Sequence, residues 1–405
     1  MNSVRLDTDR FLLRASDGLY LLSYLLCMAD AILISYSTLN AASGAHLVSL
    51  FLRGCSLLLM VWKMVWDGKH SPAVLLCTCA VCLLTAAALF KSGYNHLFYL
   101  LVACLGVWNV DVRKVLWLDF SARLLLTLFI ISGALIGAIE NYITYRMGSP
   151  QLRYSLGFNH PNTLASLVFS LVLEEAWLTR RRPGALYTLV ILVGMLPLYF
   201  LTLNRTAIAL TVVFPLLLPW AFRRRPIRKA GRVFWTLFPL PVIGFCIAAM
   251  FLCQRIPLFR DFDLLMSNRF WNSLRVYRQY GISLLGQHVH LLSVRSARVL
   301  HESPILLDVA YLRTLIQAGP LVLVFYAALY AGAFRRACLE QDRYSILVYA
   351  LFVLYGMFES GFNNVFLNFT LLLALRSWYG QKKPGVAPVK RKKMRKKIVF
   401  APGRY

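Results

Sequence analysis

Apolar runs long enough to cross a membrane recur along most of this 405-residue chain, and they constrain its fold more than any other feature. A run of about 20 residues crosses a hydrocarbon core of roughly 30 Å when it is helical. It must be helical because every backbone N–H and C=O in lipid needs a partner within the segment. The pattern therefore predicts an all-α, polytopic integral membrane protein and excludes a soluble enzyme.

The composition supports this fold class, because 59% of the residues are hydrophobic and only 15% are charged. Ordinary globular domains carry about a quarter charged residues. The first apolar run is too long for the apolar stretch of a signal peptide, so we expect an uncleaved anchor there. The runs predict about twelve transmembrane helices. Their approximate bounds are 19–37, 46–66, 72–90, 95–110, 116–138, 163–179, 185–203, 206–222, 233–253, 304–333, 344–361 and 364–379.

Lysine and arginine outnumber aspartate and glutamate by 44 to 17, which gives a formal net charge of +27. In a soluble chain this excess would suggest a nucleic-acid partner. Most of these cations instead fall in short loops and in a basic tail at 390–397. We therefore expect them to set the topology and to contact anionic lipid, with both termini cytoplasmic and no nucleic acid bound. Most of the nine cysteines lie inside apolar runs, which favours small buried side chains over a disulfide framework.

The predicted outer loops are short except for two, near 139–162 and 254–303. Long loops without evident secondary structure are usually functional or disordered, and the second loop is too aromatic to be disordered. Function is therefore expected in these two loops. The chain divides into four parts on this basis: N-terminal helices (1–138), a core with both outer loops (139–333), C-terminal helices (334–380) and a basic cytoplasmic tail (381–405).

The longer loop is strongly cationic, which opposes the usual bias of outer loops. An anionic ligand at the outer face would explain this charge. Within the loop, apolar and polar side chains separate onto two faces at helical spacing over 267–280, which predicts an amphipathic helix at the membrane interface. The arginines of this loop are Arg255, Arg260, Arg269, Arg275, Arg278, Arg295 and Arg298.

The shorter loop brings a fixed cation, a titratable imidazole and an amide, Arg153, His160 and Asn162, to the start of the sixth predicted helix. Free N–H groups at a helix N-terminus favour anions. A helix cap by Asn162 after Pro161 explains the amide equally well, and the two interpretations are compatible. Arg205 lies between two apolar runs at the outer membrane edge. A simple turn there would be cheaper with Ser or Gly, so we interpret Arg205 as functional.

Four further polar residues stand in or beside apolar runs. Arg53 and Arg123 interrupt predicted helices, and pairing with a neighbouring helix is as good an explanation as substrate contact. Asp308 and Tyr311 lie where the longer loop enters the tenth predicted helix. A carboxylate there can orient a hydroxyl or accept its proton, but a favourable charge near the helix N-terminus explains it as well.

The sequence predicts no metal or cofactor. His288 and His290 form a His-x-His pair, but no further ligands follow at zinc-like spacing. A nucleotide-binding loop, a dinucleotide fingerprint and a catalytic serine motif are also missing from any suitable context in the sequence.

Five short motifs follow one another over about 140–330. They are Leu156-Gly157-Phe158-Asn159-His160-Pro161-Asn162, Asn204-Arg205-Thr206, Asn268-Arg269-Phe270-Trp271, Asp308-Val309-Ala310-Tyr311 and Gln317-Ala318-Gly319. In order and spacing they resemble the O-antigen polymerase and ligase family, and most closely the polysaccharide polymerases of bacterial capsule and exopolysaccharide clusters. Val309 departs from the Asn or His that the family often has. Arg146 to Gly157 and Arg275 to Gly286 match the Arg-x10-Gly spacing of family polymerases, a spacing that also arises readily by chance here.

The resemblance implies a multi-pass enzyme of the bacterial cytoplasmic membrane that joins undecaprenyl-diphosphate-linked repeat units outside the cytoplasm. It implies the lipid bilayer, and flippase and chain-length regulator proteins, as partners. We expect Arg153, Arg205 and Arg269 to bind the diphosphate, since a guanidinium donates bidentately and stays charged. His160 is the first candidate for polarising the acceptor hydroxyl, with Asp308 second. The expected substrate-binding set also includes Asn162, Arg146, Arg275, Arg278 and Tyr311.

Two alternatives remain open. A ligase of the same family would move a finished glycan onto a different acceptor. A secondary transporter would suit about twelve helices, but transporters usually show two similar halves and polar, broken helices at the midplane. The distinctive polar residues of this chain gather instead at one predicted face.

Overall fold

The computed structural model describes residues 2–67, 72–108, 110–145, 151–223, 225–292, 297 and 300–378. Helices dominate it. The first half contains α1 (Asn2–Ala29), the π-helical turn η1 (Asp30–Ser35), η2 (Thr38–Ala41), α2 (Ala45–Asp67), α3 (Pro72–Ser92), α4 (His96–Gly106), α5 (Val112–Leu135), α6 (Pro161–Thr179) and α7 (Ala185–Thr202). The second half contains α8 (Arg205–Ala221), α9 (Lys229–Leu237), α10 (Pro239–Leu252), α11 (Pro257–Leu265), α12 (Arg269–Tyr280), α14 (Ala310–Arg313), η3 (Thr314–Ala318), α15 (Pro320–Leu339), α16 (Arg343–Tyr355), η4 (Ser360–Asn363) and α17 (Thr370–Trp378).

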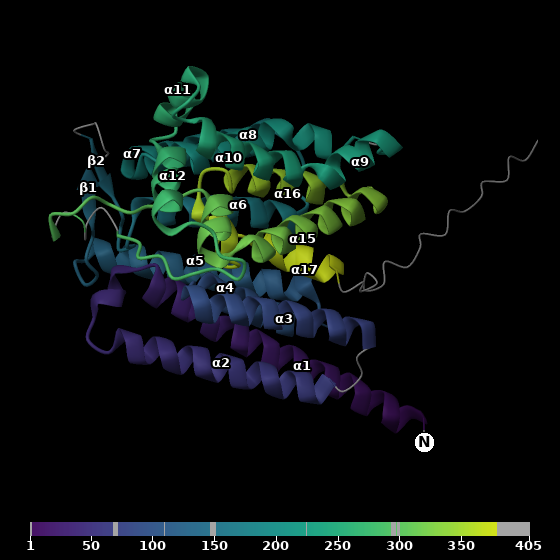
Figure 1. Ribbon diagram of the computed structural model, residues 1–405. Coiled ribbons are helices and arrows are strands. Elements are labelled where there is room, and N and C mark those ends of the chain that lie inside the picture. Colours follow the sequence, from purple (N-terminus) through teal and green to yellow (C-terminus); the bar gives the residue numbers. More distant parts are fainter. Residues whose placement is uncertain are drawn as a thin grey trace, which may run out of the picture.

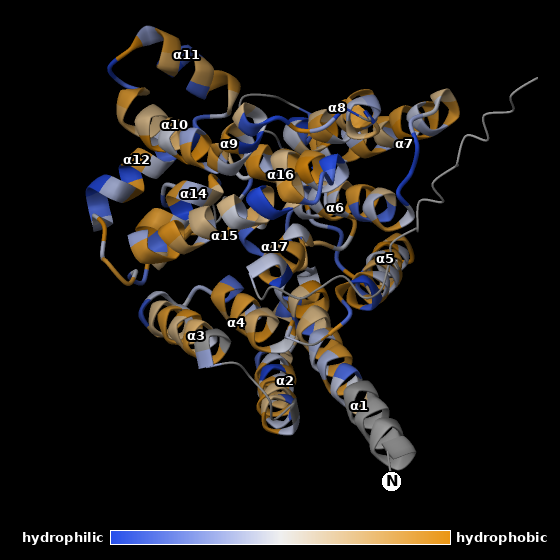
Figure 2. Cartoon of the chain, turned by 90° about the vertical axis from the view of Figure 1, so that its right-hand side faces the viewer, coloured by the Kyte–Doolittle hydropathy of each residue, from blue (hydrophilic) through white to orange (hydrophobic). Residues whose placement is uncertain are grey.

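Seven helices of the described chain are long and apolar enough to cross a membrane, which confirms a multi-pass helical membrane protein. Three shorter apolar helices, α4, α8 and α16, accompany them. Their lipid-facing character is visible on α2, where Leu47, Phe51, Leu58, Trp62 and Val65 are all exposed. In Figure 2, hydrophobic residues lie on the outward sides of helices at the rim such as α2 and α3. The seven segments are Ala15–Ser35, Ala45–Trp66, Leu75–Ser92, Val112–Leu135, Ala185–Thr202, Lys229–Leu252 and Pro320–Leu339.

Three of the predicted transmembrane helices are wrong in their bounds. The run predicted at 344–361 stops as the helix α16 at Tyr355. The run predicted at 304–333 starts as irregular chain and the short elements α14 and η3, and the long helix α15 begins only at Pro320. Gly319, at φ 95°, and Pro320 break the helix there, because proline has no N–H to donate. The run predicted at 364–379 contains only the nine-residue helix α17.

An irregular segment at 356–369 precedes α17 and is largely buried. Non-helical backbone at membrane depth is tolerated only where the protein itself satisfies its polar groups. Here backbone turns and asparagine side chains do so together: Leu367 N–H donates to Asn364 O (3.0 Å), Asn364 Oδ1 accepts from Phe366 N–H (2.8 Å), and Asn368 Nδ2 donates to Phe362 O (2.8 Å). Because the segment is apolar, its sequence alone does not reveal that the helix is interrupted here.

Arg123 of α5 stabilises the same segment from inside the bundle. It is fully buried and pairs with Asp119 (2.6 Å) and with Glu174 of α6. Its Nη1 donates to Ser170 Oγ (2.6 Å) and to Phe366 O (2.9 Å). Of the two explanations for this residue, the structure therefore shows pairing with neighbouring helices. Arg53 likewise pairs with Asp30, at 2.6 Å.

The helices lie roughly side by side, so the molecule has two ends (Figure 1). The antiparallel hairpin of β1 (Ile143–Tyr145) and β2 (Leu152–Tyr154) gathers with α12 at one end, and the N-terminus lies at the other. The hairpin was not predicted from the sequence. At the N-terminal end the Arg180 guanidinium pairs with both oxygens of Asp342, at 2.8 and 2.9 Å. The basic tail at 390–397 lies outside the described residues.

Candidate functional site

The loop between β2 and α6 is anchored on the chain that follows η1 and on α5. Gly157 has φ +86°, and an added Cβ would approach Ile130 O at 2.9 Å, so the turn requires glycine. Thr38 N–H donates to Gly157 O (2.9 Å) and Asn159 N–H donates to Tyr36 O (2.9 Å). These contacts fix the start of α6 at the hairpin end of the molecule.

His160, and not Asn162, is the N-cap of α6. Its Nδ1 accepts from the Asn162 N–H at 3.1 Å, and Pro161 occupies the first helical position. The cap by Asn162 is therefore wrong, because the imidazole already accepts the bond that the amide was expected to accept. The Asn162 side chain is left for other contacts: Oδ1 accepts from Arg153 Nη2, and Nδ2 donates to Glu359 Oε1 at 3.3 Å.

Glu359 lies at the centre of the site and joins residues that are far apart in the sequence. Its Oε1 accepts from Arg269 Nη2 (3.0 Å) and from Asn204 Nδ2 (3.2 Å). Arg153 connects to the carboxylate through Asn162, and its Nε donates to Thr202 O at 2.6 Å. Two of the three arginines expected at the diphosphate therefore belong to one hydrogen-bonded cluster.

Arg269 is positioned by the start of α12. Asp263 of α11 accepts the N–H groups of Phe270 (2.8 Å) and Trp271 (2.9 Å), and so caps the helix. The predicted amphipathic helix at 267–280 is confirmed as α12, with Phe270 buried and Arg275 exposed. Arg269 Nη1 is buried and makes no hydrogen bond within the described part of the chain.

The electrostatics of the cluster are balanced. Arg153 and Arg269 are two cations, while Glu359 and Asp308 are two acids, and Asp308 lies close enough to act on Arg269, Glu359 and His160. His160 keeps exposed ring surface, but the surrounding protein displaces water and the Arg153 charge lies nearby. Both effects disfavour the imidazolium, so they lower the pKa of His160 to about 4. The ring is therefore neutral at pH 7.

The remaining expected residues lie around this cluster or away from it. Arg205 is the exposed first residue of α8, next to Asn204. Tyr311 is buried and its hydroxyl donates to Val353 O at 2.6 Å, so it packs in the core. Arg146 lies outside the described residues.

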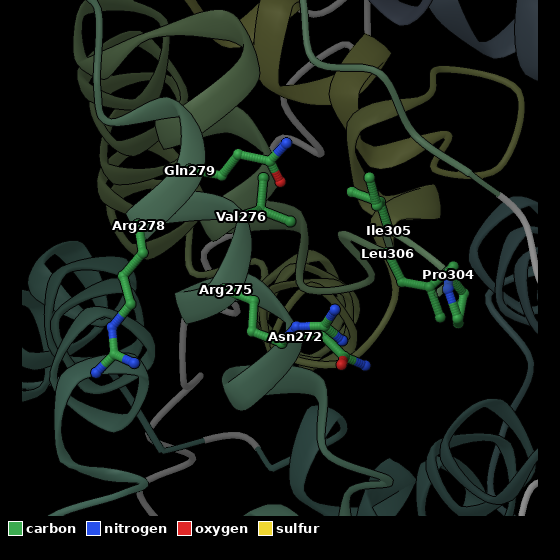
Figure 3. Close-up of a pocket in the computed structure, with 8 residues that line it drawn as sticks. All are labelled: Asn272, Arg275, Val276, Arg278, Gln279, Pro304, Ile305 and Leu306. Atoms are coloured by element: carbon green, nitrogen blue, oxygen red, sulfur yellow. The ribbon is translucent and has the colours of Figure 1, made fainter. Parts of the chain in front are cut away.

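A cavity of about 320 Å³ lies between α12 and the chain at 304–306. Its lining includes two of the expected residues, Arg275 and Arg278. Figure 3 shows the Arg275 side chain extending along the cavity near Asn272, whereas Arg278 points away from Pro304 and its neighbours. The Arg278 guanidinium stacks instead over the Trp271 ring, at 5.5 Å. Arg275 is therefore the better placed of the two to meet a ligand.

Sequence reasoning missed Glu359 and Asn204. Glu359 was assigned to the apolar run 344–361, although α16 ends at Tyr355. A carboxylate inside an apolar run is a recognised sign of a functional or paired residue, and that signal was present in the sequence.

Comparison with family models, curated proteins and solved structures finds no match for this chain. Within the described residues, no group of three or more His, Cys, Asp and Glu side chains is arranged to hold a metal ion. What the site can do follows from its own chemistry: it offers guanidinium and amide donors, a neutral imidazole and two carboxylates at one end of a membrane protein.

Proposed function

We propose that this protein polymerises undecaprenyl-diphosphate-linked oligosaccharide repeat units at the outer face of the bacterial cytoplasmic membrane. The observation that supports this best is the meeting of Arg153 and Arg269 in one cluster through Asn162 and Glu359. These arginines come from the two outer loops of the proposed topology, which has about twelve membrane crossings and both termini in the cytoplasm. Guanidinium groups from separate loops suit a diphosphate.

In the proposed reaction, a hydroxyl oxygen of the acceptor repeat unit attacks the anomeric carbon of the donor glycan. The bond between that carbon and the diphosphate oxygen breaks, and the diphosphate leaves with the electron pair. Arg269 is placed to stabilise this charge, since its Nη1 has no protein partner within the described chain. Arg153, exposed Arg205 and Arg275 add positive charge around it.

The geometry favours Asp308 over His160 as the acceptor of the hydroxyl proton. His160 Nδ1 already accepts the Asn162 N–H, so a neutral ring carries its proton on Nε2. Such a ring donates a hydrogen bond and has no free lone pair. Asp308 makes no side-chain hydrogen bond within the described residues and is partly exposed. In this mechanism His160 Nε2–H donates to the substrate and Asp308 takes the proton.

Deletion of the gene in its host, with complementation by variants, tests the proposal. A strain without the protein should accumulate single lipid-linked repeat units. Arg269→Lys should behave in the same way at a normal protein level, because lysine keeps the charge beside Glu359 but loses the planar fork. Arg260→Gln is the control, because this exposed arginine of α11 lies 3.9 Å from Asp261 and belongs neither to the cluster nor to the cavity lining. Full-length lipid-linked chains in the deletion strain would point to a ligase, and unchanged glycans would refute both.

A further inference from the structure

Arg313, which none of the predictions above includes, lies beside the site as the last residue of α14. Figure 2 shows α14 between α12 and α15. The Arg313 Nε donates to Gln317 Oε1 (3.1 Å), and Nη1 donates to Ser360 Oγ (3.3 Å). The guanidinium carbon lies 4.7 Å from the centroid of the Tyr94 ring. Three separate segments of the chain therefore contact this side chain.

All of these partners are neutral. Arg53, Arg123, Arg180 and Arg269 each form an ion pair with a carboxylate, but Arg313 forms none within the described residues. A guanidinium has five N–H donors, and the bonds above use two of them. Arg313 is half-buried, so water screens its charge only in part. A half-buried cation without a counter-ion attracts an anion.

The surroundings of Arg313 are polar. The Tyr36 hydroxyl and His96 Nε2 lie 2.9 Å apart, and both groups are near enough to Arg313 to feel its charge. Asn364 Nδ2 donates to the Tyr36 hydroxyl at 2.6 Å. Hydroxyl and guanidinium groups are among the donors that recur around bound phosphates.

The Arg313 group adjoins the cluster around Glu359. Consecutive residues bind the two arginines: Glu359 accepts from Arg269, and Ser360 accepts from Arg313. Consecutive Cα atoms are about 3.8 Å apart, so the two guanidinium groups flank one short piece of chain. The Arg269 guanidinium is paired with a carboxylate, whereas the Arg313 guanidinium is bound only by neutral groups.

We propose that Arg313 forms a second anion subsite, which binds the diphosphate of the acceptor lipid while Arg269 and Arg153 bind that of the donor. This inference rests on the proposed function. A polymerase joins two substrates that both carry a prenyl diphosphate, and only the donor loses it. Two neighbouring cationic positions meet that need, whereas a ligase with an acceptor that lacks a diphosphate needs one.

Titration of the purified full-length protein in detergent with farnesyl diphosphate tests this by calorimetry. The wild type should bind two equivalents, Arg313→Gln one, and Arg269→Gln one. Arg343→Gln is the matched control and should bind two, because Arg343 also stacks on an aromatic ring, 5.1 Å from Trp220, but lies next to Asp342 at the opposite end. The second subsite would be overturned if Arg313→Gln still bound two equivalents of farnesyl diphosphate. It would also be overturned if the wild type bound only one equivalent and Arg269→Gln abolished that binding. The proposed function would stand in both cases. No binding by the wild type would refute the proposed function itself.

Two further arms keep the test decisive. If Arg313→Gln does not fold, Arg313→Lys keeps the charge but loses the planar fork, and one of the two affinities should fall about tenfold. Unchanged affinities at both sites would overturn the proposal. Inorganic pyrophosphate distinguishes the source of the anion. If it binds the Arg313 subsite as tightly as farnesyl diphosphate does, the acceptor lipid is the wrong ligand; weaker binding supports the lipid.

Discussion

Glu359→Gln separates the structural role of the central carboxylate from its effect on ligand binding. Glutamine keeps the size and one acceptor oxygen but removes the negative charge. The side chains of Arg269 and Glu359 expose only 15% and 9% of their surface, so water screens the pair poorly. A hydrogen bond to a charged partner contributes about 1.5–3 kcal/mol. We expect a loss of about 2 kcal/mol of unfolding free energy, less than the roughly 3–5 kcal/mol for removing one partner of a buried pair.

The same substitution should strengthen the binding of an anion at Arg269. A phosphate on Nη1 would lie about 6 Å from the carboxylate, where two unit charges interact by about 3 kcal/mol at an effective dielectric constant of 20. Looser positioning of Arg269 offsets part of this gain. A net effect of about 1.4 kcal/mol corresponds to roughly tenfold tighter binding of farnesyl diphosphate. The variant should therefore be less stable and yet bind more tightly.

Thermal unfolding and calorimetric titration of the detergent-solubilised protein measure the two effects. Glu340→Gln is the control, because the Arg336–Glu340 pair exposes 27% and 32% of its side chains. Exposed pairs of this kind contribute about 0.3–0.5 kcal/mol. The reasoning fails if Glu359→Gln unfolds at the same temperature as Glu340→Gln, or if it binds farnesyl diphosphate more weakly than the wild type.

Three other predictions follow from described contacts. Arg123→Gln leaves two buried carboxylates without their cation and should lower the unfolding free energy by about 3–5 kcal/mol, so the amount of this variant in membranes should fall. Arg181→Gln, at an exposed pair, should leave the amount of protein unchanged. Equal amounts of the two variants would contradict the buried pairing. The pKa of His160 is about 4 in the folded protein and about 6.5 in the unfolded chain. Between these values the unfolded chain binds more protons, so the unfolding free energy should fall as the pH drops from 6.5 towards 4. His160→Asn keeps a capping side chain but lacks this titration, and melting at pH 7 and 5 should show a smaller loss than in the wild type; an equal loss would remove His160 as the cause. Arg205→Lys keeps an exposed charge but loses the fork, so polymer should shorten at unchanged protein level, and normal polymer length would exclude Arg205 from the site.

The membrane-spanning helices were predictable because lipid imposes a local rule: about 20 apolar residues in a row must be helical. The helix α12 was predictable for a similar reason, because its apolar residues recur every three or four positions and so form one face of a helix. The irregular chain at 356–369 escaped this reasoning. Its apolar residues satisfy the length rule, but its backbone bonds go to nearby turns and to asparagine side chains instead of a continuous helix.

The sequence by itself determined the environment of this protein and the polar residue types that interrupt or adjoin its apolar runs, because hydropathy and charge act through each residue and its near neighbours. Only the tertiary structure decided which of those residues meet. Arg153, Asn162, Arg269 and Glu359 lie in separate segments, and their pairing depends on how the helices pack. The same packing leaves Arg313 without a carboxylate, although Glu359 is the neighbour of the serine that binds it. Hydrogen bonds between distant segments are set by three-dimensional geometry, and no local pattern in the chain encodes them.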